Sequence, residues 1–223
     1  MIPAVGPIQI RPALPQGGFL YAVIDAGMAG ERSLTTWAEL LSGKDRAPVV
    51  QWRFKGLNDA EALAGGRELR AVTERRGVRL FINDRPDIAR IVGADGVHVG
   101  QDDLDPDDVR AILPHALIGV STHNRAQFTR AMASSADYIA VGPIFGTTSK
   151  ENPDPAVGSE FVTWAAGRTD RPIVAIGGLN AANAAQIVRA GARGLAVISD
   201  LMKADRPDEA ARTLQRIIRP TAG

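Results

Sequence analysis

Short apolar runs alternate with longer amphipathic stretches along most of the chain. The runs are rich in Val and Ile and are bounded by Gly, Asp or Pro, which is typical of strands buried in a parallel sheet. The pattern predicts eight strands, which lie at Phe19–Asp25, Val49–Arg53, Arg79–Ile82, Gly96–Val99, Leu117–Ser121, Asp137–Val141, Ile173–Ile176 and Gly194–Ile198.

The stretches between these runs have the apolar spacing of amphipathic helices. Three of them begin at recognisable start signals, because Asn58, Asp105 and Ser159 each stand immediately before the helical pattern. The predicted helices are Leu34–Ser42, Asp59–Arg76, Pro86–Val92, Pro106–Leu113, Arg125–Ser134, Glu160–Ala166, Ala181–Ala190 and Pro207–Ile218.

This order of elements predicts an α/β protein built as a single (β/α)₈ TIM barrel, in which every strand is followed by a helix. An open doubly wound sheet alternates in the same way, but no Gly-x-Gly-x-x-Gly follows the first run. Residues 19–219 are predicted to form the catalytic barrel domain. Residues 1–18 contain four prolines and no compact apolar run, so we expect a disordered or loosely docked N-terminal arm.

Composition narrows the class of protein further. The 223 residues are 45% hydrophobic, which is enough for a substantial core, and 26 basic against 25 acidic residues leave a net charge of +1. This balance argues against partners such as nucleic acid or a membrane surface. The chain has no cysteine, no apolar run long enough to span a membrane and no signal-peptide pattern. We therefore expect a cytoplasmic globular protein.

Two cations follow the second predicted strand, at the end of the barrel where active sites form. Because side chains alternate along a strand, Gln51, Arg53 and Lys55 share one side, and Trp52 and Phe54 share the other. Two cations at the barrel mouth favour an anionic ligand, although two ordinary surface cations would explain this stretch equally well.

Acidic residues follow the next two strands. Asp84 comes directly after the third strand, and Asp102 and Asp103 come after the fourth. Taken alone, Asp84 is interpreted more simply as a helix cap and the other two as an acidic loop. Beside the two cations, however, converging carboxylates favour a Mg²⁺–diphosphate site, because Mg²⁺ takes one or two carboxylates together with phosphate oxygens.

A second anion site is indicated at the far end of the chain. The connection 142–158 is long for a compact barrel and carries Thr147, Ser149 and Lys150, so it is a candidate lid, although a plain surface excursion has the same pattern. The Gly177–Gly178 pair follows the seventh strand. Loops after the seventh and eighth strands of such barrels often hold a phosphate.

The histidines give a weaker signal. His98 lies within the fourth strand, where a satisfied core histidine is at least as good an interpretation as a catalytic one. His123 follows the fifth strand and is better placed at the mouth, whereas His115 precedes that strand, at the opposite end. The chain has no His-Glu-x-x-His, Gly-x-Ser-x-Gly or P-loop motif, so zincin, serine-hydrolase and Walker-type chemistry have no support.

The ordered motifs QWRFK, IND, GVHVGQDD, GVSTH, DYIAVGPIF–TTSK, AIGG and VIS resemble those of the thiamine phosphate synthase family over nearly the whole barrel. The resemblance implies a Mg²⁺-dependent transferase. It would couple 4-amino-2-methyl-5-hydroxymethylpyrimidine diphosphate with 4-methyl-5-(2-hydroxyethyl)thiazole phosphate, giving thiamine phosphate and diphosphate. It also implies that diphosphate leaves first and that the thiazole nitrogen captures the resulting pyrimidine-methyl cation.

The resemblance assigns roles residue by residue. The catalytic positions would be Arg53, Lys55, Ser121 and Lys150. Arg53, Lys55 and Lys150, with Gln51 and Asn83, would contact the pyrimidine diphosphate, and Ser121, which matches the family's serine after strand five, would be a further substrate-binding position. The thiazole phosphate would be held by Thr147, Ser149, Gly178, Ile198 and Ser199, and Mg²⁺ by Asp84 and Asp103.

Three positions depart from the family pattern. Phe54 stands where an acidic residue is usual, and we expect it to pack against the helices rather than to alter the chemistry. Gly146 replaces a common proline, and Ser149 replaces a frequent threonine but keeps its hydroxyl.

Two other functions remain open alternatives. One is a thiazole tautomerase of similar fold, with His123 as its acid–base group. The other is a non-catalytic barrel that binds a phosphorylated metabolite. Homo-oligomerisation is also left open, and exposed faces of Trp37 and Trp164 are candidate contacts.

Overall fold

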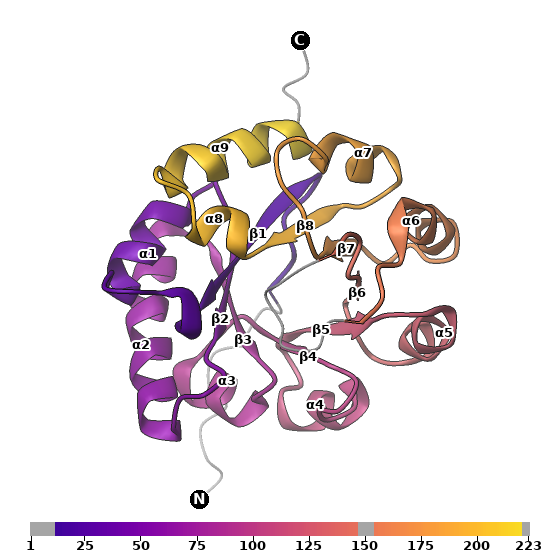
Figure 1. Cartoon of the computed structure of the whole chain (residues 1–223). Helices are drawn as coiled ribbons and strands as arrows, with labels where there is room; N and C mark the ends of the chain where they lie inside the picture. The colour runs from indigo at the N-terminus through magenta and orange to yellow at the C-terminus, as the bar shows by residue number, and fades with distance from the viewer. Residues whose placement is uncertain (1–11, 147–153, 220–223) are drawn as a thin grey trace, which may run out of the picture.

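The computed structural model describes residues 12–146 and 154–219. Their eight strands are parallel and close into a barrel in which each strand pairs with the next and the last pairs with the first. Figure 1 shows this ring of strands surrounded by helices. The strands are β1 (Phe19–Asp25), β2 (Val49–Arg53), β3 (Arg79–Asn83), β4 (Gly96–Val99), β5 (Leu117–Thr122), β6 (Tyr138–Val141), β7 (Ile173–Ile176) and β8 (Gly194–Val197). The predicted TIM barrel is therefore confirmed.

Helices cover the outer face of the barrel. They are α1 (Leu34–Leu41), α2 (Asp59–Arg76), α3 (Pro86–Val92), α4 (Pro106–Ile112), α5 (Arg125–Ala133), α6 (Gly158–Ala166), α7 (Ala184–Arg189) and α9 (Pro207–Ile218). The short 3-10 helix η1 (Ala26–Met28) and helix α8 (Ser199–Met202) follow the C-terminal ends of β1 and β8 directly. The short helix α8 was not predicted. The predicted start of α7 was three residues too early, because residues 181–183 form a turn.

Local signals account for most helix ends. Asn58 caps α2 with a complete capping box that includes Glu61, and Asp105 accepts a hydrogen bond from the backbone N–H of Asp107 at the start of α4. The predicted Ser159 cap is wrong. Helix α6 already begins at Gly158, so Ser159 lies inside its first turn.

The alternation of side chains along each strand separates two cores. One residue set packs outward against the helices, as Trp52 and Phe54 do on β2, with ring centroids 5.8 Å apart. The other set fills the inside of the barrel and includes Phe19, Tyr21, Phe81 and Tyr138. The expected outward packing of Phe54 is confirmed.

Two glycines make room for aromatic rings inside the barrel. A Cβ atom on Gly119 of β5 would lie 2.0 Å from Cζ of Tyr138, and one on Gly96 of β4 would lie 2.3 Å from Cε1 of Phe81. No real side chain tolerates such distances. These glycines therefore allow the two rings to cross the interior of the barrel.

The N-terminal end of the barrel is closed by packing and by ion pairs. Asp95 accepts from Arg70 and Arg79 at 2.8 and 2.9 Å. Residues 12–18 contain no helix or strand; Leu14 packs against the inner core, and the carbonyl of Ala13 accepts from Nε of Arg79 at 3.3 Å. Residues 1–11, the rest of the predicted arm, lie outside the described residues.

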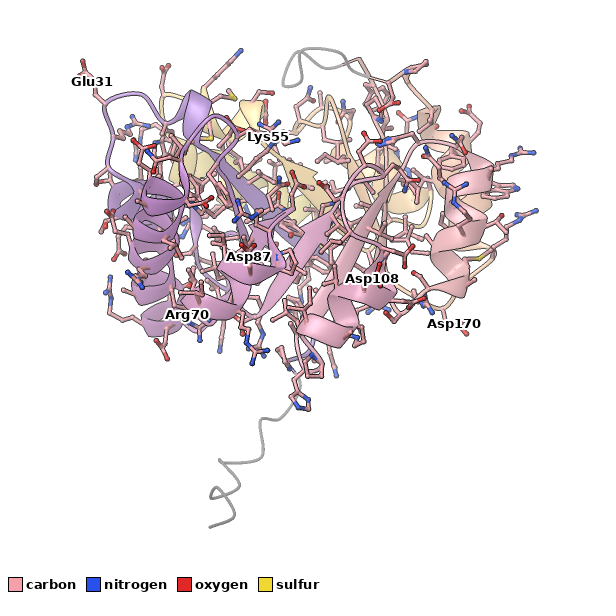
Figure 2. The ribbon with its side chains drawn as sticks, turned by 90° about the horizontal axis from the view of Figure 1, so that it is seen from below. Glu31, Lys55, Arg70, Asp87, Asp108 and Asp170 are labelled. Atoms are coloured by element: carbon pink, nitrogen blue, oxygen red, sulfur yellow. The ribbon has the colours of Figure 1, made fainter. Side chains whose placement is uncertain are left out.

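Figure 2 separates the two ends of the barrel. Glu31 and Lys55, which follow β1 and β2, lie at the upper edge, whereas Arg70 and Asp170 lie toward the lower edge. Within the described ranges, no helix has the length and apolar character needed to cross a membrane.

Candidate active site

The C-terminal end of the barrel opens into a cavity of about 520 Å³. Residues from all eight strands or from the loops after them line it, as expected for an active site in this fold. The predicted site residues that line the cavity are Gln51, Arg53, Lys55, Asn83, Asp84, Asp103, Ser121, Gly178, Ile198 and Ser199. Thr147, Ser149 and Lys150 lie outside the described residues.

The two predicted cations are held differently. Arg53 ends β2 and forms a close ion pair with the buried carboxylate of Asp25, at the end of β1. Nζ of Lys55 lies 3.3 Å from Oδ2 of Asp84, and its side chain is 63% exposed. Arg53 is therefore fixed in direction, whereas Lys55 reaches the cavity from solvent.

Asp84 has an unusual backbone. Its φ of 62° is the only positive value at a non-glycine position in the described part of the chain. Its N–H donates to the carbonyl of His98 at 2.7 Å, which ties the turn to β4. Helix α3 has Arg85 at its N-cap and no side-chain cap, so the helix-cap interpretation of Asp84 is wrong. Backbone strain of this kind is concentrated at functional sites.

Asp84 also has a shifted pKa. Burial raises the pKa of this carboxyl to about 6, and a hydrogen bond and charge repulsion with Asp103 act in the same direction, while Lys55 opposes them. Asp103 itself is oriented by the N–H of Gly100, which donates to Oδ2 at 2.7 Å. Two carboxylates that repel each other beside a cavity form a position that a cation would stabilise.

The donor set fits Mg²⁺ better than a transition metal. Among the residues that the structure describes, no three His, Cys, Asp or Glu side chains converge as a complete metal cage. Two carboxylates do meet, at Asp84 and Asp103. Mg²⁺ uses such a pair readily, because water and substrate phosphate complete its octahedron.

The glycine pair after β7 supports the start of the long connection. Gly177 and Gly178 have φ values of 101° and 66°, and the N–H groups of Ile144 and Phe145 donate to the carbonyls of Ile176 and Gly177 at 2.9 and 3.1 Å. A Cβ atom on Gly178 would lie 2.7 Å from Cβ of Phe145. The glycines are therefore required for this close approach, which shapes one wall of the cavity.

The histidines at the mouth are both hydrogen-bonded. His98 lines the cavity, with Nδ1 2.8 Å from the hydroxyl of Tyr138 and Nε2 2.8 Å from Oγ of Ser121. His123 donates from Nδ1 to the carbonyl of Gly142 at 2.6 Å, and its Nε2 lies 3.6 Å from Oδ2 of Asp154. His115 is exposed. His98 is therefore a satisfied histidine that also borders the cavity, and a catalytic role for it stays a prediction.

Three residues of the site were missed in the sequence. Asp25 was assigned only as the last residue of β1, and Tyr21 and Tyr138 only as apolar strand residues. Burial raises the pKa of both tyrosines well above 10. A signal was available, because these are the only two tyrosines of the chain and both lie inside predicted strands, where a phenol needs a hydrogen-bond partner.

The two tryptophans considered for self-association differ in exposure. Trp37 is 2% exposed and donates from Nε1 to the carbonyl of Ala29 at 2.9 Å, so it presents no free face. Trp164 is half-buried, and the guanidinium groups of Arg125 and Arg168 lie over its ring.

Comparisons with known proteins agree on one family. A family model described as thiamine monophosphate synthase matches residues 20–201. The chain is 43% identical to the thiamine-phosphate synthase of Chloroflexus aurantiacus over 204 residues, which cover 91% of this chain and 93% of the relative. It is 42% identical to that of Roseiflexus sp. (strain RS-1) over 205 residues, or 91% of this chain and 86% of the relative.

A solved structure agrees with these relatives. The thiamine phosphate pyrophosphorylase from Pyrococcus furiosus superimposes with a TM-score of 0.82 at 30% identity. The superposition covers 92% of this chain and 97% of that one. The fold and the sequence therefore both agree with these relatives over nearly the whole length of the chain.

Proposed function

The chain belongs to the thiamine monophosphate synthase family, and we propose that it couples the aminopyrimidine diphosphate with the thiazole phosphate in a Mg²⁺-dependent reaction that releases diphosphate. The observation that carries the proposal is the carboxyl of Asp84, which meets Asp103 and Lys55 at the mouth of the barrel on a residue with a positive φ. A Mg²⁺ ion would offset the negative charge of the two carboxylates and allow a diphosphate to bind beside them.

The metal would be held by Asp84 and Asp103, together with oxygen atoms of the substrate diphosphate. When bound, Mg²⁺ would supply positive charge to the leaving diphosphate. The fit rests on the hard oxygen donors and on the mutual repulsion of the two carboxylates.

The cationic side chains would stabilise charge on the leaving group. Arg53 is held toward the cavity by Asp25, so its guanidinium needs little reorganisation when diphosphate departs. Lys55, and Lys150 from the connection after β6, would add further positive charge. In a dissociative reaction the thiazole nitrogen captures the pyrimidine-methyl cation, so the site needs no strong general base.

The second anion site would lie across the cavity. Gly178, Ile198 and Ser199 line the wall formed by β7 and β8, opposite the carboxylates that follow β3 and β4 in the closed strand order. We propose that this wall holds the thiazole phosphate, with Thr147 and Ser149 as further donors. Two substrates would then be oriented in one enclosed space with water excluded.

The proposal also covers the cellular location of the protein and its partners. We propose that the protein works in the cytoplasm on small molecules, without nucleic acid or membrane partners. Its balanced charge supports the part of this proposal that concerns nucleic acid and membrane surfaces.

Formation of thiamine phosphate tests the function directly. The purified protein is incubated with both substrates and Mg²⁺, and product is followed after oxidation to fluorescent thiochrome. Product that requires both substrates is expected. Isomerisation of the thiazole phosphate alone would favour the tautomerase alternative, with His123 as its acid–base group, and binding without any conversion would favour a non-catalytic barrel.

Substitution of Gly178 tests the thiazole phosphate site. In Gly178→Ala the new Cβ would be too close to Phe145, and the positive φ would be strained, so the wall has to move. We expect KM for the thiazole phosphate to rise at least about 10-fold, which corresponds to about 1.4 kcal/mol, with KM for the pyrimidine diphosphate much less affected. Equal changes in both constants would contradict separate sites.

A further inference from the structure

A continuous chain of hydrogen-bonded side chains crosses the inside of the barrel. Nε2 of Gln51 donates to the hydroxyl of Tyr21 at 3.0 Å, and the hydroxyl of Tyr138 donates to the same oxygen at 3.1 Å. His98 and Ser121 extend the chain at 2.8 Å each. Five strands contribute one residue apiece, and the chain begins and ends at residues that line the cavity.

The proton of Tyr138 determines which atom donates in each hydrogen bond of this series. Burial keeps this phenol protonated, and its single proton is used toward Tyr21. The Tyr138 oxygen must then accept from Nδ1–H of His98. A neutral imidazole carries one N–H, so Nε2 presents its lone pair and accepts from Oγ–H of Ser121.

This direction decides what Ser121 can offer to a ligand. With its proton directed at His98, Oγ of Ser121 presents only lone pairs to the cavity. A serine that only accepts prefers an N–H donor and disfavours a carbonyl oxygen, because two acceptors repel. The exocyclic amine of the proposed pyrimidine substrate is such a donor.

We propose that Tyr138 and His98 are positioning residues that hold Ser121 as an obligatory acceptor, and that the site thereby selects an aminopyrimidine over the corresponding oxopyrimidine. The inference rests on the proposed function for the identity of the ring. The inference depends physically on the tautomer of His98, which is a property of the protein alone.

Packing keeps this series of hydrogen-bonded side chains in one geometry. The rings of His98 and Tyr138 are stacked with centroids 5.6 Å apart, and the gap at Gly119 admits the phenol. The backbone of Ser121 is also held, because Nε2 of Gln101 donates to its carbonyl at 2.7 Å. The hydroxyls of Tyr138 and Ser121 are therefore already oriented before the substrate binds.

The tautomer can be measured without turnover. Long-range ¹H–¹⁵N correlation spectra distinguish Nδ1–H from Nε2–H imidazole, and the missing signals in His98→Gln assign the residue. We expect the Nδ1–H tautomer in the wild-type protein at pH 7.5. An Nε2–H tautomer or an imidazolium would overturn the proposal, even if the enzyme makes thiamine phosphate.

Selectivity is tested with Tyr138→Phe, which removes the acceptor for Nδ1–H and leaves His98 able to donate from Nε2. The ratio of kcat/KM for the amino and 4-oxo pyrimidine diphosphates is expected to exceed about 100 in the wild type and to fall at least 10-fold in the variant. The control is Phe81→Leu, which removes a ring packed 5.8 Å from that of Tyr138 but no hydrogen bond.

Each outcome is decisive. An unchanged ratio in Tyr138→Phe, or the same fall in Phe81→Leu, would overturn the proposal. If neither the wild-type protein nor any variant turns over, the proposed function fails, and this result leaves the further inference to be decided by binding. The calorimetric affinities of wild type and variant for the amino and oxo forms of the free hydroxymethylpyrimidine then replace the kinetic ratio, with the same expected fall.

Discussion

Replacing Asp84 with asparagine is expected to lower kcat at least about 100-fold while making the metal-free protein more stable. Asparagine retains the shape and tolerates the positive φ of 62° found at this position, but it removes the negative charge that would hold Mg²⁺. Most losses of activity through a core or backbone change are accompanied by a loss of stability. In Asp84→Asn, activity is expected to fall while the stability of the metal-free protein rises.

The stability gain follows from the raised pKa of Asp84. Because this pKa is about 6 in the folded protein and near 3.8 when unfolded, the folded state binds more protons between these values. The parent protein therefore loses stability as pH rises from 4 to 6, and the variant does not. A gain on the order of 1–2 kcal/mol is expected at pH 8, less than the full shift would give because the attraction to Lys55 is also lost.

The measurement is thermal unfolding in EDTA between pH 4 and 8, with turnover measured in Mg²⁺. Asp108→Asn is the matched control, since it makes the same chemical change on the exposed flank of the barrel (Figure 2). It should leave stability within about 0.5 kcal/mol. Normal turnover in Asp84→Asn would remove the basis for the metal site.

Gly119→Ala is expected to be the most destabilising single methyl addition in the barrel interior. The new Cβ would lie 2.0 Å from Cζ of Tyr138, whose ring is fully buried among Tyr21 and Phe81 and has nowhere to move. Overpacking of this kind costs about 3 kcal/mol, or a fall in Tm of roughly 6–12 °C in a protein of this size.

Two further variants test the cause of that loss. In a Tyr138→Leu background the clash is absent, so adding Gly119→Ala should cost less than about 1 kcal/mol. Gly146→Ala is the matched control, because nothing lies within 4 Å of its added Cβ. An equal loss in both backgrounds would show that the cost arises from the strand rather than from the phenol.

The order and bounds of the strands could be predicted because each is a short apolar run between chain-breaking residues. All eight predicted ranges agree with the structure to within one residue at either end. Alternation along β2 also placed Gln51, Arg53 and Lys55 correctly on the cavity side. Such features depend on local sequence, so they are readable without knowledge of distant contacts.

Other features depend on contacts between distant segments. The pairing of Asp25 with Arg53 joins residues 28 positions apart, and Tyr21 meets Tyr138 across 117 positions. Helix α8 is only four residues long, too short for a periodic signal. Asp84 resembles a helix cap in sequence, and only its backbone geometry shows otherwise. The roles of Thr147, Ser149 and Lys150 remain predictions, since they lie outside the described residues.

The most direct test of the central claim is the ratio of diphosphate released to thiamine phosphate formed in one reaction. Both products are quantified from the same samples, with Mg²⁺ and with EDTA. A ratio of about 1 with Mg²⁺, and neither product in EDTA, is the expected result. Diphosphate release without thiamine phosphate, or product formation that persists in EDTA, would contradict a metal-dependent coupling of the two substrates at this site.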